Sequence, residues 1–355
     1  MEPKTLLPGV GEGIPERILV AGGAGFIGST FVRKLLLQGQ GFAVTVLDKL
    51  TYAGNLGNLE EVSQHPRYRF VQGDICDREL ALRLARDVDC IVNFAAETHV
   101  DRSILEPDAF IQTDVVGTHS LLEAARLAQH RRFLQVSTDE VYGDVPSPRR
   151  SVETDPLRPR SPYSASKASA ELLCLAYHAT YGMDVLLTRG SNTYGPHQYP
   201  EKIVPLFITQ ALDGLPLPVY GDGGAVRDYL FVEDHGLGIA TVLARGLAGN
   251  AYNLGRGDAP VSGLEVAETV LQLTGADTAL AQRVEDRPGH DRRYALDSAK
   301  AHGLGWSPKV GFAEGMRQTV DWYRDHRGWW GPVKEGEFAD FYRRNYRPLA
   351  GPVSS

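Results

Sequence analysis

Short apolar or β-branched runs alternate with stretches of helical periodicity along the first half of the chain. The runs predict β-strands at residues 17–21, 43–48, 68–72, 90–94, 132–137 and 184–189. The helix-period stretches cover residues 26–38, 78–86, 109–129 and 166–181. This alternation predicts an α/β fold built on a doubly wound parallel sheet.

The pattern changes after Asn192, where Pro and Gly interrupt the segments PHQYPEKIVP, DGLPLPVYGDGG and EDRPGHDRR. Loop-rich segments of this kind are typical of binding regions. We therefore expect a dinucleotide-binding domain at residues 16–190 and a smaller, interleaved substrate-binding domain at 191–335, with some segments returning to the first domain. Residues 1–15 are expected to form a loose leader and residues 336–355 a C-terminal tail.

Composition narrows the function classes. The chain has 355 residues, 37 Lys and Arg against 44 Asp and Glu, and a net charge of −7. This mild acidity argues against binding to nucleic acid or to an anionic membrane. The three cysteines are widely spaced and form no CxxC, so neither a disulfide framework nor a metal site is expected. With neither a signal peptide nor a long apolar run in the sequence, we expect a cytoplasmic protein.

A glycine-rich turn predicts a dinucleotide site. Gly22, Gly25 and Gly28 join the first strand to the first helix, where a pyrophosphate meets the N–H groups of the helix N-terminus. Asp48 ends the second strand 20 residues after Gly28, where its carboxylate accepts hydrogen bonds from a ribose and repels a 2′-phosphate. NAD is therefore favoured over NADP. The alternative is a glycine turn that only packs helix on strand.

Asp74 follows the third strand, at a place where a side chain meets adenine. An aspartate at a strand end is also a common turn or cap residue.

Tyr163 and Lys167 lie four residues apart in SPYSASKAS, near a helix start marked by Pro162. A neighbouring ammonium and a cationic nicotinamide favour the phenolate, so Tyr163 is a candidate base for a substrate hydroxyl. The alternative is an ordinary pair on a helix surface.

Thr138, Asp139 and Glu140 directly follow the strand at 132–137. Because strand ends of a parallel sheet face the ligand crevice, these polar groups are candidates for chemistry. Two adjacent carboxyl groups in different environments can act as an acid and a base. The alternative is a helix N-cap with acidic residues that complement the helix dipole.

Several motifs extend these signals: AGGAGFIGS, DKLTYAGNLGNL, GDICD, NFAAETHVDRSI, STDEVYGD, SPYSASKAS, SNTYGPHQYPEKIVPLFI, RDYLFVEDH and EDRPGHDRRY. From about Arg17 to about Trp330 the chain resembles the extended short-chain dehydrogenase/reductase family of sugar-nucleotide enzymes, and most closely its 4,6-dehydratase branch. Ala21, where many relatives carry Thr, and the NTYGPHQ loop depart from the common pattern. The loop difference puts the nucleotide preference in doubt more than the reaction type.

The resemblance implies NAD-dependent dehydration of dTDP-glucose to dTDP-4-keto-6-deoxyglucose in deoxysugar biosynthesis. Tyr163, assisted by Lys167, would take the C4 hydroxyl proton as hydride passes to NAD, and Thr138 would hydrogen-bond the C4 oxygen. Asp139 as acid and Glu140 as base would eliminate water across C5 and C6 before the hydride returns to C6. The resemblance also implies a homodimer formed through helices 109–129 and 166–181, unless their apolar faces only cover the sheet.

The resemblance assigns two further sets of residues. The expected cofactor-binding residues are Gly22, Gly25, Phe26, Ile27, Gly28, Asp48, Lys49, Thr51, Asp74, Ile75, Ala95, Ala96, Thr98, Thr113, Tyr163, Lys167 and Asn192. The expected substrate-binding residues are His99, Thr138, Asn192, Glu201, Lys202, Pro218, Val219, Tyr220, Arg227, Asn253, Arg287 and His290. Among these, Lys202, Arg227 and Arg287 supply loop cations for a diphosphate, and residues 218–220 would flank the nucleobase.

Other functions remain open at this point. A 4-epimerase or a uronate decarboxylase would share the NAD site and the Tyr163–Lys167 pair, but has no need of the doublet Asp139–Glu140. A non-catalytic NAD-binding regulator would not need Tyr163 and Lys167 intact.

Overall fold

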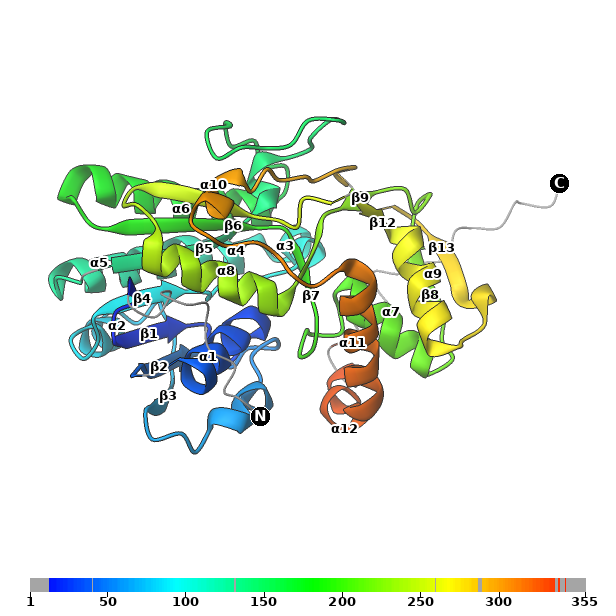
Figure 1. Ribbon diagram of the computed structural model, residues 1–355, viewed down its shortest axis with the longest axis horizontal. Helices are drawn as coiled ribbons and strands as arrows, with labels where there is room; N and C mark the ends of the chain where they lie inside the picture. Colours follow the sequence, from blue (N-terminus) through cyan, green and yellow to red (C-terminus); the bar gives the residue numbers. More distant parts are fainter. Residues whose placement is uncertain are drawn as a thin grey trace.

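The computed structural model describes residues 13–39, 41–130, 132–258, 260–286 and 289–335, together with Phe338 and Tyr342. Within these ranges the centre is a seven-stranded parallel sheet, ordered β11-β6-β5-β4-β1-β2-β3 (Figure 1). Its strands are β1 (Arg17–Ala21), β2 (Ala43–Asp48), β3 (Tyr68–Gln72), β4 (Cys90–Asn93), β5 (Arg132–Thr138), β6 (Val185–Gly190) and β11 (Asn250–Leu254). The strand order reverses between β1 and β4, which marks the ligand crevice of such sheets. The predicted doubly wound fold of the Rossmann type is confirmed.

Alternating side chains of the strands pack under helices on both faces of the sheet. Ile18 and Val20 of β1 belong to the apolar core under α1 (Phe26–Gln38) and α8 (Val232–Arg245). Leu19 and Ala21 belong to the core on the opposite face, under α2 (Arg78–Ala85), α5 (Thr118–Leu127) and α6 (Pro162–Tyr181). Because both faces are covered, the central strands β1, β4 and β6 are buried over nearly their whole length rather than on alternate positions.

Apart from the packing on the two faces of the sheet, a separate apolar core lies beside it (Figure 1), and we call it the second core. It is built mainly from three helices, α7 (Ile203–Leu212), α9 (Gly263–Thr274) and α11 (Phe312–Asp325). Small sheets accompany it: β7 (Asn192–Tyr194) with β10 (Tyr229–Phe231), β9 (Val226–Arg227) with β12 (Val261–Ser262), and β8 (Leu217–Tyr220) with β13 (Ala281–Val284). Since α8 and β11 come late in the chain but join the large sheet, the smaller part is interleaved with the first, as predicted.

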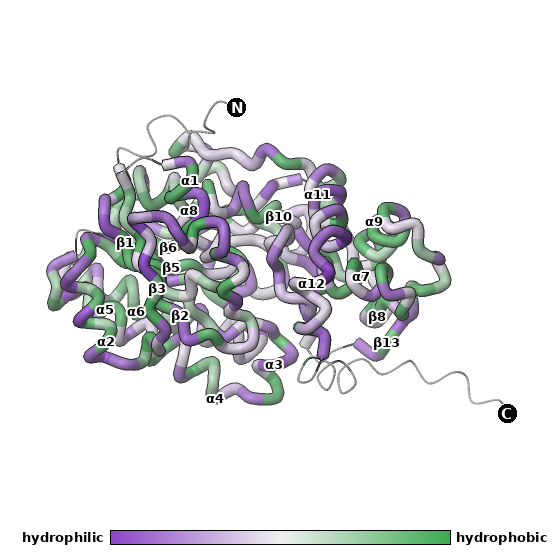
Figure 2. Tube along the Cα trace, turned by 90° about the horizontal axis from the view of Figure 1, so that it is seen from below, coloured by the Kyte–Doolittle hydropathy of each residue, from purple (hydrophilic) through white to green (hydrophobic). Residues whose placement is uncertain are grey.

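Short elements complete the described chain: η2 (Leu56–Val62), α3 (Val100–Leu105), α4 (Pro107–Phe110), η3 (Ile111–Gly117), η4 (Asp139–Tyr142), η5 (Thr278–Leu280), α10 (Ala299–Gly303), α12 (Arg327–Trp330) and η6 (Pro332–Lys334). Figure 2 shows the central strands as mainly apolar and α11 as largely polar. In the part of the chain that is described, the helices are each too short or too polar to cross a bilayer.

The predicted helix at 109–129 is wrong in its detail. The segment begins as α4, continues as the π-helix η3 and becomes α-helical again in α5. A π turn is short and lies within a longer helix, so the apolar pattern of the whole segment still indicates a helix. The periodicity therefore does not reveal the π turn.

The helix that carries Tyr163 starts earlier than its apolar period does, at Pro162. Ser161 and Ser164 form a capping box there: the Ser164 N–H donates to Ser161 Oγ at 3.1 Å, and the Ser161 N–H donates to Ser164 Oγ at 3.0 Å. Both N–H groups are thereby satisfied by side chains, which fixes where α6 begins.

The ends of the chain are partly described. Ile14 was expected in a loose leader, but it is buried in the core under α1 and α8, while residues 1–12 lie outside the described residues. Most of the predicted tail also lies outside them; Phe338 is buried in the second core, and the Tyr342 hydroxyl donates to the Pro216 carbonyl oxygen at 3.3 Å. The other predicted domain boundaries stay predictions.

A buried ion pair fastens α6 to the sheet. Arg189 on β6 is 4% exposed and Glu171 on α6 is 0% exposed. Arg189 Nη2 lies 2.6 Å from Glu171 Oε2, and Arg189 Nε lies 2.9 Å from the same oxygen. Arg189 Nη1 also donates to the Tyr142 hydroxyl at 2.6 Å. Each charge is therefore compensated inside the fold.

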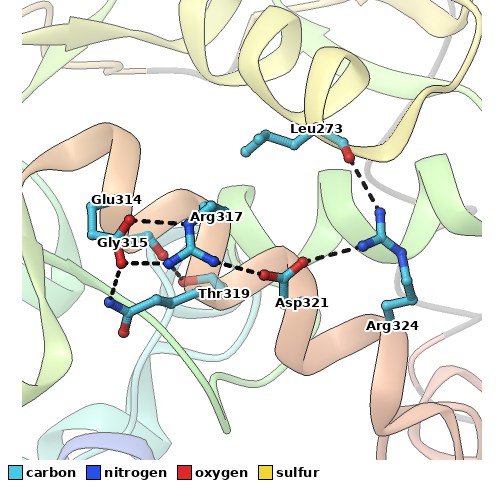
Figure 3. Close-up of polar contacts among 8 residues, drawn as sticks. Leu273, Glu314, Gly315, Arg317, Thr319, Asp321 and Arg324 are labelled. Carbon is cyan, nitrogen blue, oxygen red and sulfur yellow. Dashed lines mark hydrogen bonds and ion pairs between the residues drawn. The ribbon is translucent and has the colours of Figure 1, made fainter.

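The ion pairs along α11 are of a different kind, because they lie at the surface. Figure 3 shows Glu314, Arg317, Asp321 and Arg324 linked in a ladder, with Arg324 reaching the Leu273 carbonyl oxygen at the end of α9. Their side chains are about half exposed, so water screens the pairs.

Replacing Glu171 by Ala is expected to lower the free energy of unfolding by about 3–5 kcal/mol, because it leaves Arg189 buried without its carboxylate. The matched control is Glu314→Ala, which removes an exposed, solvent-screened pair and is expected to cost far less. Urea titration of both variants measures this, and equal losses would contradict the structural role of the buried pair.

Candidate active site

Two adjoining cavities lie where the strands of the large sheet end. The first, of about 300 Å³, is lined by residues that follow β1, β2, β4, β5 and β6. The second, of about 180 Å³, extends it towards β8 and β9. Both cavities are lined by Glu140, Tyr163, Asn192, Glu201 and Lys202. A ligand that fills both would therefore pass these five side chains.

The turn between β1 and α1 is held close to its neighbours. Gly22 has φ +73°, and a Cβ there would lie 2.4 Å from the backbone nitrogen of Ala95. A Cβ on Gly28 would lie 2.4 Å from the Gly22 carbonyl oxygen. Gly25, the N-cap of α1, has no side chain to bind the N–H groups of the first turn. Since Gly25 to Gly28 line the first cavity, these groups are placed to bind an anion.

Asp48 closes β2 at the edge of the first cavity and is 9% exposed. Its Oδ2 accepts the Ala24 N–H and its Oδ1 accepts the Leu50 N–H, both at 2.9 Å. Burial raises the pKa of this carboxyl group, while the two backbone hydrogen bonds act in the opposite direction. Each oxygen keeps a further lone pair for hydroxyl groups such as those of a ribose.

Asp74 follows β3, lines the first cavity and pairs with Lys49, whose Nζ is 2.7 Å from Asp74 Oδ2. Burial acts to raise the pKa of Asp74, but hydrogen bonds from Lys49 and Cys76 outweigh it and hold the pKa below its ordinary value. The residue is thus an ionised hydrogen-bond acceptor at neutral pH.

Tyr163 and Lys167 come from the first two turns of α6 and line the first cavity together. Burial raises the pKa of Tyr163 well above its ordinary value, and the nearby carboxylates of Glu140 and Asp114 raise it further. A hydrogen bond with Thr138 acts in the opposite direction.

That Lys167 favours the Tyr163 phenolate stays a prediction. Lys167 Nζ donates to the Val136 carbonyl oxygen at 2.8 Å, and burial lowers the pKa of this ammonium.

Thr138, Asp139 and Glu140 form the end of β5 and the start of η4. Thr138 Oγ1 accepts the Glu140 N–H at 3.3 Å, so the N-cap alternative describes the local structure correctly. The cap does not exclude chemistry, because all three residues also line the first cavity.

Asp139 is 3% exposed, and burial together with the charge of Glu140 raises the pKa of its carboxyl group well above the ordinary value, against the opposing charge of Arg227. This shift favours the protonated form of the carboxyl group, which is able to donate a proton.

The first cavity also presents buried polar atoms that the protein does not satisfy. Within the described ranges, these side-chain atoms lie on the cavity lining with no hydrogen-bond partner: Ser137 Oγ, Asp139 Oδ2, Ser191 Oγ, Asn192 Oδ1, Gln198 Oε1 and His235 Nε2. Buried polar groups are nearly always paired in native proteins. The lining therefore fits a polar ligand with several hydroxyl, amide or phosphate groups.

The cofactor-site residues predicted from the sequence come together, since all of them line the first cavity. Most of the predicted substrate residues line the second: His99, Asn192, Glu201, Lys202, Pro218, Val219, Tyr220, Arg227 and His290. Thr138 lines the first cavity. Arg287 lies outside the described residues. That these residues touch a ligand stays a prediction.

Asn253 does not fit its predicted role. It is 0% exposed on β11 and lines neither cavity. Its Nδ2 donates to the carbonyl oxygens of Ser151 at 2.9 Å and Asp297 at 3.1 Å, and its Oδ1 accepts the Tyr142 hydroxyl at 2.8 Å. These bonds occupy the amide in joining two loops to the sheet.

Two of the predicted cations sit on regular elements rather than loops. Arg227 lies on β9, and Lys202 is the N-cap of α7, where its Nζ donates to Thr98 Oγ1 at 3.0 Å. Backbone hydrogen bonds therefore fix the positions of Arg227 and Lys202, which the sequence pattern had placed in loops.

Asp114 was not predicted, although it lies in the π-helix next to Thr113, which lines the first cavity. It is 1% exposed, and burial raises the pKa of its carboxyl group to about 6, against the opposing charge of Lys167. Its oxygens accept the Ser166 hydroxyl at 2.5 Å and the Glu97 N–H at 2.9 Å. In the sequence, the one signal that could have indicated Asp114 was an acidic residue inside a helix expected to pack on the sheet.

A parallel sheet with a glycine turn, a tyrosine and lysine on one helix and a carboxyl pair at a strand end defines a dinucleotide-dependent enzyme of the short-chain dehydrogenase/reductase type. The model of the family described as GDP-mannose 4,6 dehydratase matches residues 19–319. The chain belongs to this family.

Individual relatives agree with this assignment. A dTDP-glucose 4,6-dehydratase of Streptomyces niveus is 51% identical over 328 residues, which cover 91% of this chain and 97% of the relative. The crystal structure of DesIV, a dTDP-glucose 4,6-dehydratase from Streptomyces venezuelae with NAD and TYD bound, has a TM-score of 0.87 and 52% identity, covering 90% of this chain and 100% of that one. A UDP-glucose 4-epimerase of Thermus thermophilus in complex with NAD has a TM-score of 0.80 and 36% identity, over 87% of this chain and 99% of the epimerase.

Proposed function

We propose that the chain is an NAD-dependent hydro-lyase that converts dTDP-glucose to dTDP-4-keto-6-deoxyglucose. The observation that carries this proposal is the carboxyl pair Asp139 and Glu140 beside Tyr163, at the junction of the two cavities. Elimination of water needs an acid and a base at one place, and burial raises the pKa of Asp139, which favours its protonated form. The curated relatives at about half identity carry the name of this activity.

The first cavity is suited to NAD. The first turn of α1 would bind the pyrophosphate, Asp48 the adenosine ribose, and Asp74 with Ile75 the adenine. When bound, NAD supplies a hydride acceptor for sugar C4 and a hydride donor for C6. Related solved structures contain NAD.

Tyr163 takes the proton of the C4 hydroxyl, with Thr138 bound to the same oxygen. The positive charge of NAD, when bound, would favour the phenolate that takes this proton. Lys167, held by the Val136 carbonyl, supplies the positive charge on this helix face.

Asp139 and Glu140 then divide the elimination. Glu140 removes the C5 proton, made acidic by the neighbouring ketone, and Asp139 gives its proton to the departing C6 oxygen, which leaves as water. The proton on Glu140 is available for return to C5. The proton that Tyr163 took from the C4 hydroxyl replaces the one that Asp139 gave to the leaving water, so no outside acid or base is consumed.

The second cavity is suited to the nucleoside diphosphate. Arg227 and Lys202 would hold the diphosphate, with Arg287 joining them, and residues 218–220 would flank the nucleobase. This assigns NAD to residues 16–190 and the sugar nucleotide mainly to 191–335.

The chain is further proposed to act in the cytoplasm, where a reducing milieu suits its widely spaced cysteines. Fractionation of cells that produce the protein tests this, and recovery in an extracellular or periplasmic fraction would contradict it.

A homodimer is proposed through the helical face of α3, η3 and α6. Leu105, Ile111 and Leu172 on these elements are 57%, 50% and 58% exposed, which is unusual for large apolar side chains. Sedimentation velocity is expected to give a dimer for the wild type and a monomer for Leu172→Glu; a monomeric wild type would contradict the proposal.

The proposed function is tested by incubating the purified protein with dTDP-glucose, without added NAD, and measuring the mass of the sugar nucleotide. Loss of one water, with the cofactor recovered in oxidised form, is the expected result. If dTDP-glucose is unchanged even with NAD supplied while UDP-glucose is epimerised, the chain is a 4-epimerase; no turnover of either favours a non-catalytic regulator.

Replacing Tyr163 by Phe is expected to reduce turnover by at least about a hundredfold, because the group that takes the C4 proton is lost. The cofactor should remain oxidised when substrate is added, as followed by its near-ultraviolet absorbance. Normal turnover would remove Tyr163 from this role.

Replacing Asp139 by Asn keeps the shape of the side chain but removes its proton-donating carboxyl group. We expect C4 oxidation to persist and dehydration to slow by about a hundredfold or more. Single-turnover absorbance of the cofactor measures the first step and mass spectrometry the second. Unaltered dehydration would contradict the acid role.

A further inference from the structure

Arg227 packs against the segment that contains Asp291 and Tyr294. The guanidinium carbon lies 4.4 Å from the centre of the Tyr294 ring. Arg227 Nη2 donates to the Asp291 carbonyl oxygen and Nη1 to the Val226 carbonyl oxygen, both at 2.9 Å. Among the described residues these bonds occupy two of its five N–H donors, which leaves the others for an anion in the second cavity.

Tyr294 and Asp291 are themselves fixed by polar contacts. The Tyr294 hydroxyl donates to Asp291 Oδ2 at 2.6 Å, and Arg160 Nη1 lies 2.9 Å from Asp291 Oδ1. Asp291 and Tyr294 are 5% and 4% exposed, whereas the Arg160 side chain is 51% exposed. The buried carboxylate is tolerated because a hydroxyl and a cation compensate it.

Arg160 directly precedes Ser161, the N-cap of α6. Its backbone N–H donates to Ser164 Oγ at 3.1 Å, within the capping box that begins this helix. Tyr163 follows three residues later, and Tyr294 lines the second cavity together with Tyr163 and Arg227. The contacts from Arg160 through Asp291 and Tyr294 therefore join the catalytic end of α6 to Arg227.

We propose that Tyr294 and Asp291 are positioning residues that hold Arg227 against the diphosphate of the substrate, and thereby fix the sugar relative to Tyr163. The stacked ring keeps the guanidinium in one plane, which suits two parallel hydrogen bonds to phosphate oxygens. The inference rests on the proposed function, which places a nucleoside diphosphate at Arg227. It adds two residues from a segment to which only His290 and Arg287 had been assigned.

Binding of dTDP, measured by titration calorimetry, tests the role of the ring. Tyr294→Leu is expected to weaken dTDP binding about tenfold, and Tyr294→Phe, which keeps the ring, only about twofold. Arg292→Ala is the matched control: it removes an exposed arginine of the same segment that pairs with Asp222, and binding should not change. If Phe weakens binding as much as Leu does, stacking is not the cause and the proposal fails.

A double substitution separates positioning from a merely structural effect. If Tyr294 acts through Arg227, then Arg227→Gln combined with Tyr294→Leu should bind dTDP no more weakly than Arg227→Gln alone, within about twofold. Losses that multiply would overturn the proposal.

Arg160→Gln gives a second test that does not alter the buried residues. Removing this exposed partner of Asp291 should weaken dTDP binding about threefold and leave the melting temperature unchanged. Unchanged binding would overturn the link to α6, even if Tyr294→Leu fails to fold.

These measurements distinguish the inference from the proposed function. A wild-type protein that binds dTDP but does not dehydrate dTDP-glucose contradicts the proposed function and leaves the binding tests intact. A wild-type protein that does not bind dTDP overturns the inference as well.

Discussion

The packing of α6 against β5 and β6 is the constraint on which the candidate site depends. The buried pair of Arg189 and Glu171 ties the helix to β6, and the Lys167 ammonium ties it to the Val136 carbonyl of β5. The capping box at Ser161 sets where the helix begins and hence where Tyr163 projects. Since Thr138 to Glu140 continue directly from β5, the same packing brings a hydroxyl, two carboxyl groups and a phenol to one cavity.

Burial decides the charge states at this place. Burial raises the pKa of the Tyr163 phenol and of the Asp139 carboxyl group, and the charge of Glu140 raises both further. In water such groups would all ionise near their ordinary values. In a buried site the cost of desolvating several like charges keeps one of them protonated, which is how neighbouring carboxyl groups acquire different roles.

The two adjoining cavities present different binding groups but share part of their lining. Gly22 to Gly28, Asp48 and Asp74 present a helix N-terminus and carboxylates to the first cavity. Arg227 and Lys202 present cations to the second. Because Tyr163 and Glu140 belong to the lining that the two cavities share, ligands anchored in the two cavities would meet at these side chains. The contacts behind Arg227 extend this alignment to the beginning of α6.

The sequence by itself determined the order of strands and helices and the positions of the local motifs. Glycine spacing, the Tyr163–Lys167 interval and the Asp139–Glu140 doublet depend on local geometry, so a linear pattern reveals them. The tertiary structure alone decided which distant groups meet. It placed Asn253 in a buried loop contact rather than in a cavity, and it turned one predicted helix into a π-helix around the buried carboxylate of Asp114.

The charge states of side chains and the pairs between residues distant in sequence were also decided by the tertiary structure. Lys167 faces a backbone carbonyl, and Asp291 links Arg160 to Tyr294 across more than a hundred residues of chain. The residues next to a charged group in the sequence do not determine how deeply it is buried or which groups it pairs with. Both arise only when separate elements pack together.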